Sequence, residues 1–162
     1  MEGNEPINPI AKEAVNVWRI SALITHGIII LVFVILIWAS HTYDWYTWIP
    51  IVLWVLIALD IISVIWDTGI EPVISQKRWR FGISGEFVSL KHGIFQEVNI
   101  MIPMTKVQFV KVEQGPLLRQ YNLYTLSIGT LGETHDIPML PEQEALNLRG
   151  QIANNAKIKE VE

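Results

Sequence analysis

Two long apolar runs near the start of the chain, residues 20–39 and 48–66, constrain its fold more than any other feature. Each run has roughly the 17 to 25 residues with which an α-helix crosses about 30 Å of hydrocarbon. Both runs are apolar on all sides, and a chain of 162 residues is too short to cover two such helices in a soluble core. We therefore predict two transmembrane helices, which residues 40–47 join as an antiparallel hairpin.

The distribution of basic residues predicts how the hairpin is oriented. Residues 40–47 contain no Lys or Arg, whereas Lys12 and Arg19 precede the first run and Lys77 and Arg78 follow the second. Because the cytoplasmic flanks of transmembrane helices are enriched in Lys and Arg, we expect a multi-pass protein of the cell membrane with both termini in the cytoplasm. A cleaved signal peptide is the main alternative for the first run, but that run is long for such a peptide and a second span follows at once.

The sequence divides into three expected parts. Residues 1–19 form a cytoplasmic amino-terminal segment, residues 20–66 form the transmembrane hairpin, and residues 71–162 form a cytoplasmic domain. Gly69 and Pro72 are expected to end the second helix before the domain begins.

The composition of the expected domain excludes several classes of function. Residues 71–162 hold ten Lys or Arg and ten Asp or Glu, so this part of the chain is neutral overall. Domains that bind nucleic acid are strongly basic, and we therefore expect no nucleic-acid partner. The chain contains no cysteine, which excludes disulfides, thiol catalysis and thiolate metal sites.

Alternation of apolar and polar residues predicts a series of short antiparallel strands in this domain. The strands are expected at residues 79–83, 87–91, 94–102, 106–114, 123–130 and 135–137. Glycines are expected to supply positive φ at the turns, namely Gly82, Gly85, Gly93 and Gly132. Pro141 then opens a helix on which Ala145, Leu148 and Ile152 recur at helical spacing and face the sheet. The order of elements predicts an α+β fold in which a bent antiparallel barrel or sandwich is capped by a carboxy-terminal helix.

No catalytic or metal-binding motif is present in the sequence. The four histidines, His26, His41, His92 and His135, lack the spacing that would direct two imidazoles at one metal. The chain also lacks the sequence patterns of a nucleophile elbow, a phosphate-binding loop or a dinucleotide-binding turn. We therefore expect no enzymatic activity, no catalytic residues, no metal and no cofactor.

Short motifs in fixed order carry a resemblance to a known family. The motifs are Trp79 to Ile83; Gly93, Ile94, Ile102 and Pro103; Val107, Gln108, Gln114 to Leu117, Arg119 and Tyr121; and His135, Ile137, Pro138, Ala145, Leu148 and Arg149. In this order, behind a hairpin, they resemble the YdbS-like family of bacterial membrane proteins, in which two helices precede a bacterial pleckstrin-homology (PH)-like domain of unknown biochemical function. The resemblance implies a PH-like fold, membrane association and a larger membrane partner with several copies of the domain. It implies no reaction.

Two groups of residues are candidate sites. His26 lies six residues after the start of the first run and Asp60 six residues before the end of the second, so both lie about 9 Å from the inner boundary at 1.5 Å per residue. Ionisable groups at this depth are costly unless paired, which predicts a His26–Asp60 hydrogen bond, either as a structural link or with a proton-linked or ligand-linked role. Possible contacts with anionic lipid headgroups are Lys77, Arg78, Arg80 and Arg119. For Arg119, binding of backbone carbonyls is the alternative, and the other three also fit a role in topology alone.

These patterns favour a non-enzymatic module that the hairpin anchors in the lipid bilayer. We expect its domain to bind a membrane protein partner, or copies of itself, at the cytoplasmic face. An anionic-lipid-binding module and an accessory subunit of a transporter or envelope-defence system are the alternatives.

Overall fold

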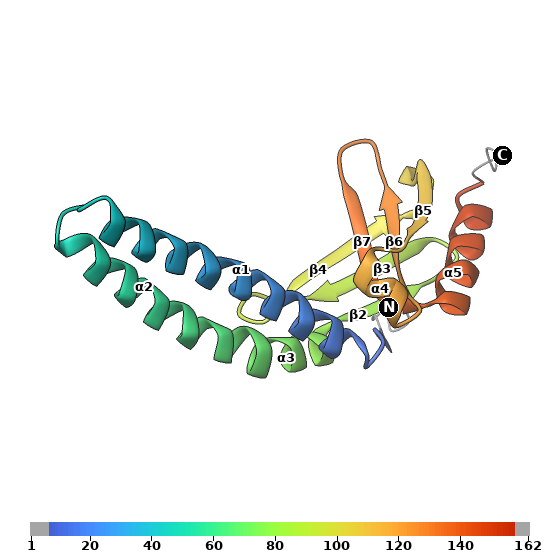
Figure 1. The fold of residues 1–162 in the computed structure, drawn as a ribbon. Helices are drawn as coiled ribbons and strands as arrows, with labels where there is room; N and C mark the ends of the chain where they lie inside the picture. Colours follow the sequence, from blue (N-terminus) through green and yellow to red (C-terminus); the bar gives the residue numbers. More distant parts are fainter. Residues whose placement is uncertain (1–6, 158–162) are drawn as a thin grey trace. The chain divides into compact units, whose positions relative to one another are not determined.

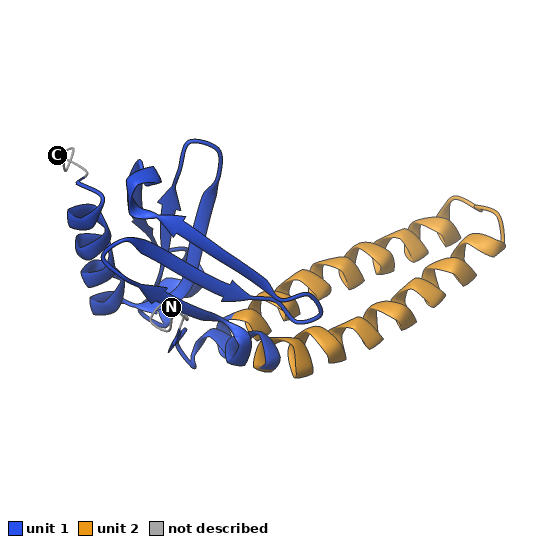
Figure 2. Cartoon of the chain, turned by 180° about the vertical axis from the view of Figure 1, so that it is seen from behind, with its two compact units in different colours: residues 1–17, 74–162 blue, residues 18–73 orange. Residues whose placement is uncertain are grey.

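The computed structural model describes residues 7–157 and divides into two compact units (Figure 2). The hairpin unit comprises residues 18–73, and the β-rich unit comprises residues 1–17 and 74–162. Residues 1–6 of the expected amino-terminal segment and residues 158–162 of the expected domain lie outside the described residues.

Two antiparallel helices form the hairpin unit, α1 (Ala14–Thr42) and α2 (Trp48–Ile65) (Figure 1). Their most apolar windows are only 6% and 11% buried, whereas the core helix of a soluble protein is mostly buried. Both helices are long and apolar enough to cross a membrane. Their exposed surfaces consist of large apolar side chains such as Leu31 and Ile62, which lipid would cover.

The second helix continues beyond the point at which the sequence analysis ended it. A π-helical turn, η1 (Trp66–Ile70), follows α2, and α3 (Glu71–Arg78) follows η1, so the helical stretch runs from Trp48 to Arg78. The predicted stop at Gly69 and Pro72 is wrong. Pro72 lies inside this continuous stretch, two residues after the π-helical turn, and local π-helical adjustments of this kind accommodate a proline in a membrane-spanning helix. The backbone N–H of Glu71 donates to the carbonyl of Trp66, which is the wider spacing of a π-helix.

Two antiparallel sheets make up most of the β-rich unit. One sheet has the order β1-β2-β3-β4, and its strands are β1 (Asn8–Pro9), β2 (Arg80–Ile83), β3 (Phe87–His92) and β4 (Val98–Pro103). The other has the order β5-β6-β7, with β5 (Phe109–Glu113), β6 (Leu123–Gly129) and β7 (Thr134–Pro141). Short helical turns η2 (Met104–Lys106) and α4 (Pro116–Gln120) precede β5 and β6. The predicted strand at 94–102 begins later, at Val98.

The carboxy-terminal helix α5 (Glu142–Asn155) lies against the second sheet, where it contacts β5, β6 and β7 (Figure 1). Its buried residues are Ala145, Leu148 and Ile152, the three that the helical spacing predicted. Alternating residues of the strands supply the rest of the core, with Phe81 and Leu126 fully buried. Burying such a side chain is worth about 1.5–3 kcal/mol. This arrangement confirms the predicted α+β class.

A short segment before α1 completes the β-rich unit. β1 pairs with β2, so that Asn8 lies opposite Phe81 and Pro9 opposite Arg80. The backbone N–H of Ala11 donates to the carbonyl of Met139 at 3.1 Å, and the side chain of Ile10 is 2% exposed. The sequence analysis did not foresee a structural role for this segment.

Gly93 is the one described glycine with positive φ, at +116°. Gly93 directly follows β3 and is the first residue of the connection to β4. A Cβ atom at this position would overlap the backbone carbonyl of Gln96. The expectation of positive φ is thus correct for Gly93 and wrong for Gly82, Gly85 and Gly132. Gly82 lies within strand β2 and not in a turn.

Candidate functional sites

His26 and Asp60 meet between the two helices of the hairpin unit. Nδ1 of His26 lies 2.8 Å from Oδ1 of Asp60, and both side chains are about nine-tenths buried, with exposures of 11% and 10%. The pairing follows from their similar depth in the hairpin, since antiparallel helices bring positions at similar depth to one level. The second carboxylate oxygen of Asp60 is buried and has no hydrogen-bond partner among the described residues.

A third residue, Asp67, joins this pair from the π-helical turn. Its Oδ2 atom lies 3.0 Å from Nε2 of His26, so the imidazole ring contacts one carboxylate through each nitrogen. The sequence analysis missed Asp67 because it assigned this residue to the end of the helix. The signal was available: Asp60 and Asp67 are seven residues apart, which places them on one face of a continuous helix.

A second cluster of polar residues lies in the β-rich unit, and we call it the basic pocket. This cavity of about 370 Å³ is lined by Lys77, Arg78, Arg80, Lys91, His92, Gly93, Glu97 and Asn99. It thus brings together three of the four candidate headgroup contacts. The ring of His92 stacks on Trp79, with the ring centroids 5.2 Å apart, which holds the imidazole beside Gly93.

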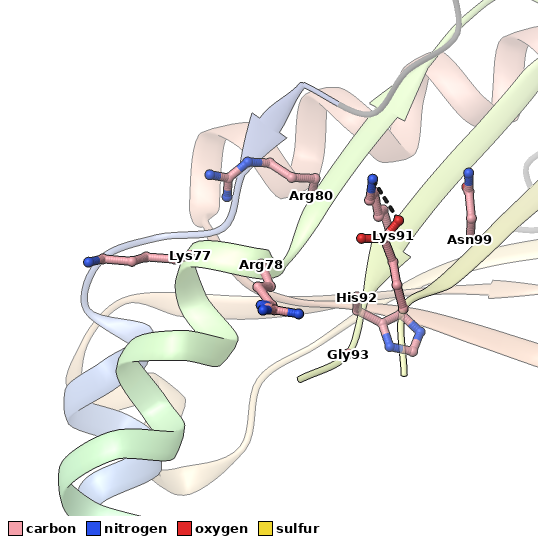
Figure 3. A pocket seen from close by; sticks show the side chains of 8 residues that line it. Lys77, Arg78, Arg80, Lys91, His92, Gly93 and Asn99 are labelled. Carbon is pink, nitrogen blue, oxygen red and sulfur yellow. Dashed lines mark ion pairs between the residues drawn. The ribbon is translucent and has the colours of Figure 1, made fainter. Parts of the chain in front are cut away.

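Several cations of the basic pocket already have partners. Lys91 forms an ion pair with Glu97 at 2.8 Å (Figure 3). Arg78 donates to the carbonyl of Ile94, and Arg80 donates to the carbonyl of Trp79, both at 2.8 Å. In Figure 3 the side chain of Arg78 points toward the side of the pocket where His92 lies, whereas those of Lys77 and Arg80 extend away from it. An arginine with one bound carbonyl retains further N–H donors for an anion.

The fourth candidate, Arg119, is not part of this pocket. It is exposed on α4, in a different part of the unit's sequence from the residues that line the cavity. The structure therefore does not combine Arg119 with Lys77, Arg78 and Arg80.

An apolar groove, which we call the β4 groove, lies elsewhere on the β-rich unit. Its cavity of about 350 Å³ is lined by Ile100, Met101, Ile102, Pro103, Lys106, Thr130, Leu131, Gly132 and His135. Leu131 is 80% exposed and Met101 is 51% exposed. Within the described residues, β4 pairs with β3 alone, so its other edge has no strand partner there.

The histidines and carboxylates of the described residues do not gather into a metal-ligand cluster. Among residues 7–157, no group of three or more His, Asp or Glu side chains is placed to hold a metal ion. His135 lies on the rim of the β4 groove and His92 in the basic pocket, in different parts of the unit.

Comparison with known proteins agrees with this architecture. A family model described as a bacterial PH domain matches residues 14–156. The chain is 32% identical over 154 residues to the UPF0699 transmembrane protein YdbS of Bacillus subtilis (strain 168), and the match covers 95% of each chain. The chain belongs to the bacterial PH domain family. It is a membrane protein of the YdbS type, with two candidate transmembrane helices and a PH-like domain. No solved structure matches the chain.

Proposed function

We propose that the chain is a non-enzymatic, membrane-anchored module whose PH-like domain binds a larger membrane protein at the cytoplasmic face of the cell membrane. Membership of the bacterial PH domain family supports a binding role. The basic residues on both flanks of the hairpin support cytoplasmic termini and a cytoplasmic domain of residues 71–162. Anchoring raises the local concentration of the domain near other membrane proteins, so a modest contact becomes effective.

The β4 groove is the observation that carries this proposal. An unpaired strand edge presents backbone N–H and C=O groups that an extended segment of another protein satisfies by adding a strand. The exposed side chains of Met101 and Leu131 next to that edge supply apolar contacts for alternate residues of the added segment. Both features fit a protein partner better than a lipid headgroup. A headgroup is recognised mainly through its charge, and these features are an unpaired strand edge and apolar side chains. We assign the added segment to a larger membrane protein that carries repeated PH-like domains.

Site-specific photo-crosslinking in living cells tests the proposal. A photoreactive amino acid at Leu131 or Met101 is expected to give a covalent adduct with a larger membrane protein. The same amino acid at Leu146, which is 46% exposed on α5, is the matched control and should give little of that adduct. Adducts of equal yield at all three positions, or none at any, would contradict the proposal. An adduct of two copies of the chain would replace the larger partner with a homo-oligomer.

The basic pocket supports a second candidate function, recognition of anionic lipid. Each basic residue near an anionic surface gains roughly 1 kcal/mol, and Arg78 keeps donors for a phosphate group. If this function operates, short-chain phosphatidylglycerol should raise the melting temperature of the solubilised chain more than short-chain phosphatidylcholine does. Arg78→Gln should abolish that difference, and Arg149→Gln, an exposed change on α5, should not. Equal effects of the two lipids on the unaltered chain would rule out this second function.

A further inference from the structure

The imidazole of His26 is held between two carboxylates in the hairpin unit. Nδ1 lies 2.8 Å from Asp60 and Nε2 lies 3.0 Å from Asp67, both within hydrogen-bond distance. His26 comes from α1, Asp60 from α2 and Asp67 from η1, so the ring joins the two arms of the hairpin.

Hydrogen-bond chemistry decides how many protons this arrangement holds. An ionised carboxylate only accepts hydrogen bonds, and a neutral imidazole has one N–H donor and one bare nitrogen. A neutral ring therefore bonds to one aspartate and places its bare nitrogen against an oxygen of the other. With a proton on each nitrogen, the ring donates to both carboxylates, and both bonds become charge-assisted.

The net charge of the cluster favours the same state. Two carboxylates beside a neutral ring carry a charge of −2, and an imidazolium reduces it to −1. Unpaired charge within a membrane-spanning segment is costly, and Asp60 already has one buried oxygen without a partner among the described residues.

Two other charged groups lie near the cluster, the cation Arg19 and the carboxyl group of Glu71. On α1, Nε of Arg19 donates to the backbone carbonyl of Thr68 at 2.8 Å. On α3, Glu71 lies close enough to Asp67 for a side-chain hydrogen bond and adds a further carboxyl group on that side. A proton on His26 would place its positive charge between the two carboxylates, within hydrogen-bond distance of both.

We propose that His26, Asp60 and Asp67 form a proton-binding site within the hairpin, in which an imidazolium links the two arms. The bound ligand is a single proton, and its release leaves one carboxylate without a donor. Raising the pH far enough to remove this proton therefore loosens the link between α1 and the region of η1. The proposed proton-binding site gives Asp67 a role beyond a simple contact between two helices. The site does not depend on the protein partner proposed above.

Nuclear magnetic resonance of the full chain in lipid nanodiscs, with ¹⁵N-labelled histidine, tests the proposal. Replacing His41, His92 and His135 in turn by Gln assigns the signals. At pH 7.5 about one-tenth of an unperturbed histidine is doubly protonated. We expect most His26 rings to carry two protons under the same conditions, at least a fivefold increase over free histidine in the same buffer.

Two matched variants separate proton binding from a structural contact. In Asp67→Asn the amide can donate to Nε2, so His26 should become neutral with its proton on Nδ1, facing Asp60. In Asp60→Asn the same argument places the proton on Nε2, facing Asp67. A neutral His26 in the unaltered chain at pH 7.5 would overturn the proposal. So would an imidazolium that persists in both variants, because it would not depend on the pair of carboxylates. If either variant fails to insert, the spectrum of the unaltered chain decides alone.

Discussion

Gly93 is the position in the β-rich unit where adding one methyl group should have the largest local effect. Its φ of +116° lies in a region that residues with a Cβ atom rarely adopt, and strain of this kind costs about 1–3 kcal/mol. In addition, the new Cβ would overlap the carbonyl of Gln96, a backbone atom that cannot rotate away by itself. We therefore expect Gly93→Ala to destabilise the unit by an amount near the upper end of that range, about 2–3 kcal/mol.

The melting temperature of the detergent-solubilised chain measures this effect. For a domain of 60–100 residues, 1 kcal/mol corresponds to roughly 4–8 °C, so Gly93→Ala should lower the transition by about 10–20 °C. The stacked Trp79–His92 pair next to Gly93 contributes a near-ultraviolet circular dichroism signal for following it. Gly85→Ala is the control, because a Cβ there meets open space, and it should leave the transition unchanged or slightly higher. Equal transitions for the two variants would refute the reasoning about Gly93.

Two further predictions concern the amino-terminal segment and α5. Ile10 is buried against the β-rich unit, so Ile10→Ala should lower its stability by about 2–5 kcal/mol, whereas Ile7→Ala, at a position 79% exposed, should have almost no effect on the denaturation midpoint. Burial raises the pKa of Glu144, so the folded chain favours its protonated form and is penalised for its ionised form. Glu144→Gln should therefore raise the melting temperature at pH 7. The gain should vanish as the pH falls below 4.5, the ordinary pKa of a glutamate side chain. A gain that is independent of pH would contradict burial of the ionised carboxylate as the cause.

The sequence predicted the elements that carry a clear periodic signal. The strands after residue 79 alternate apolar and polar residues, and the face of α5 repeats at helical spacing, so both could be placed within a few residues. β1 has only two residues, one of them Pro9, and neither is typical of a strand. Its pairing depends on β2 and on the buried Ile10, which are tertiary contacts that no local pattern reveals.

The sites were predicted in the same uneven way. His26 and Asp60 stood out because ionisable residues are rare in apolar runs. Asp67 did not, because Gly69 and Pro72 close behind it are typical of a helix end. The basic pocket and the β4 groove combine residues from separate strands and turns. Their assembly depends on the register between β3 and β4 and on the turn after β6, which composition does not determine.

Accessibility of single cysteines in intact cells tests the central claim most directly, because the natural chain has no cysteine. The two positions are Tyr46, in the turn between α1 and α2, and Asn154, near the end of α5. A membrane-impermeant maleimide should label Tyr46→Cys in intact cells, and should label Asn154→Cys only after the membrane has been permeabilised. Labelling of Asn154→Cys from outside intact cells would contradict a hairpin anchor that holds the PH-like domain in the cytoplasm.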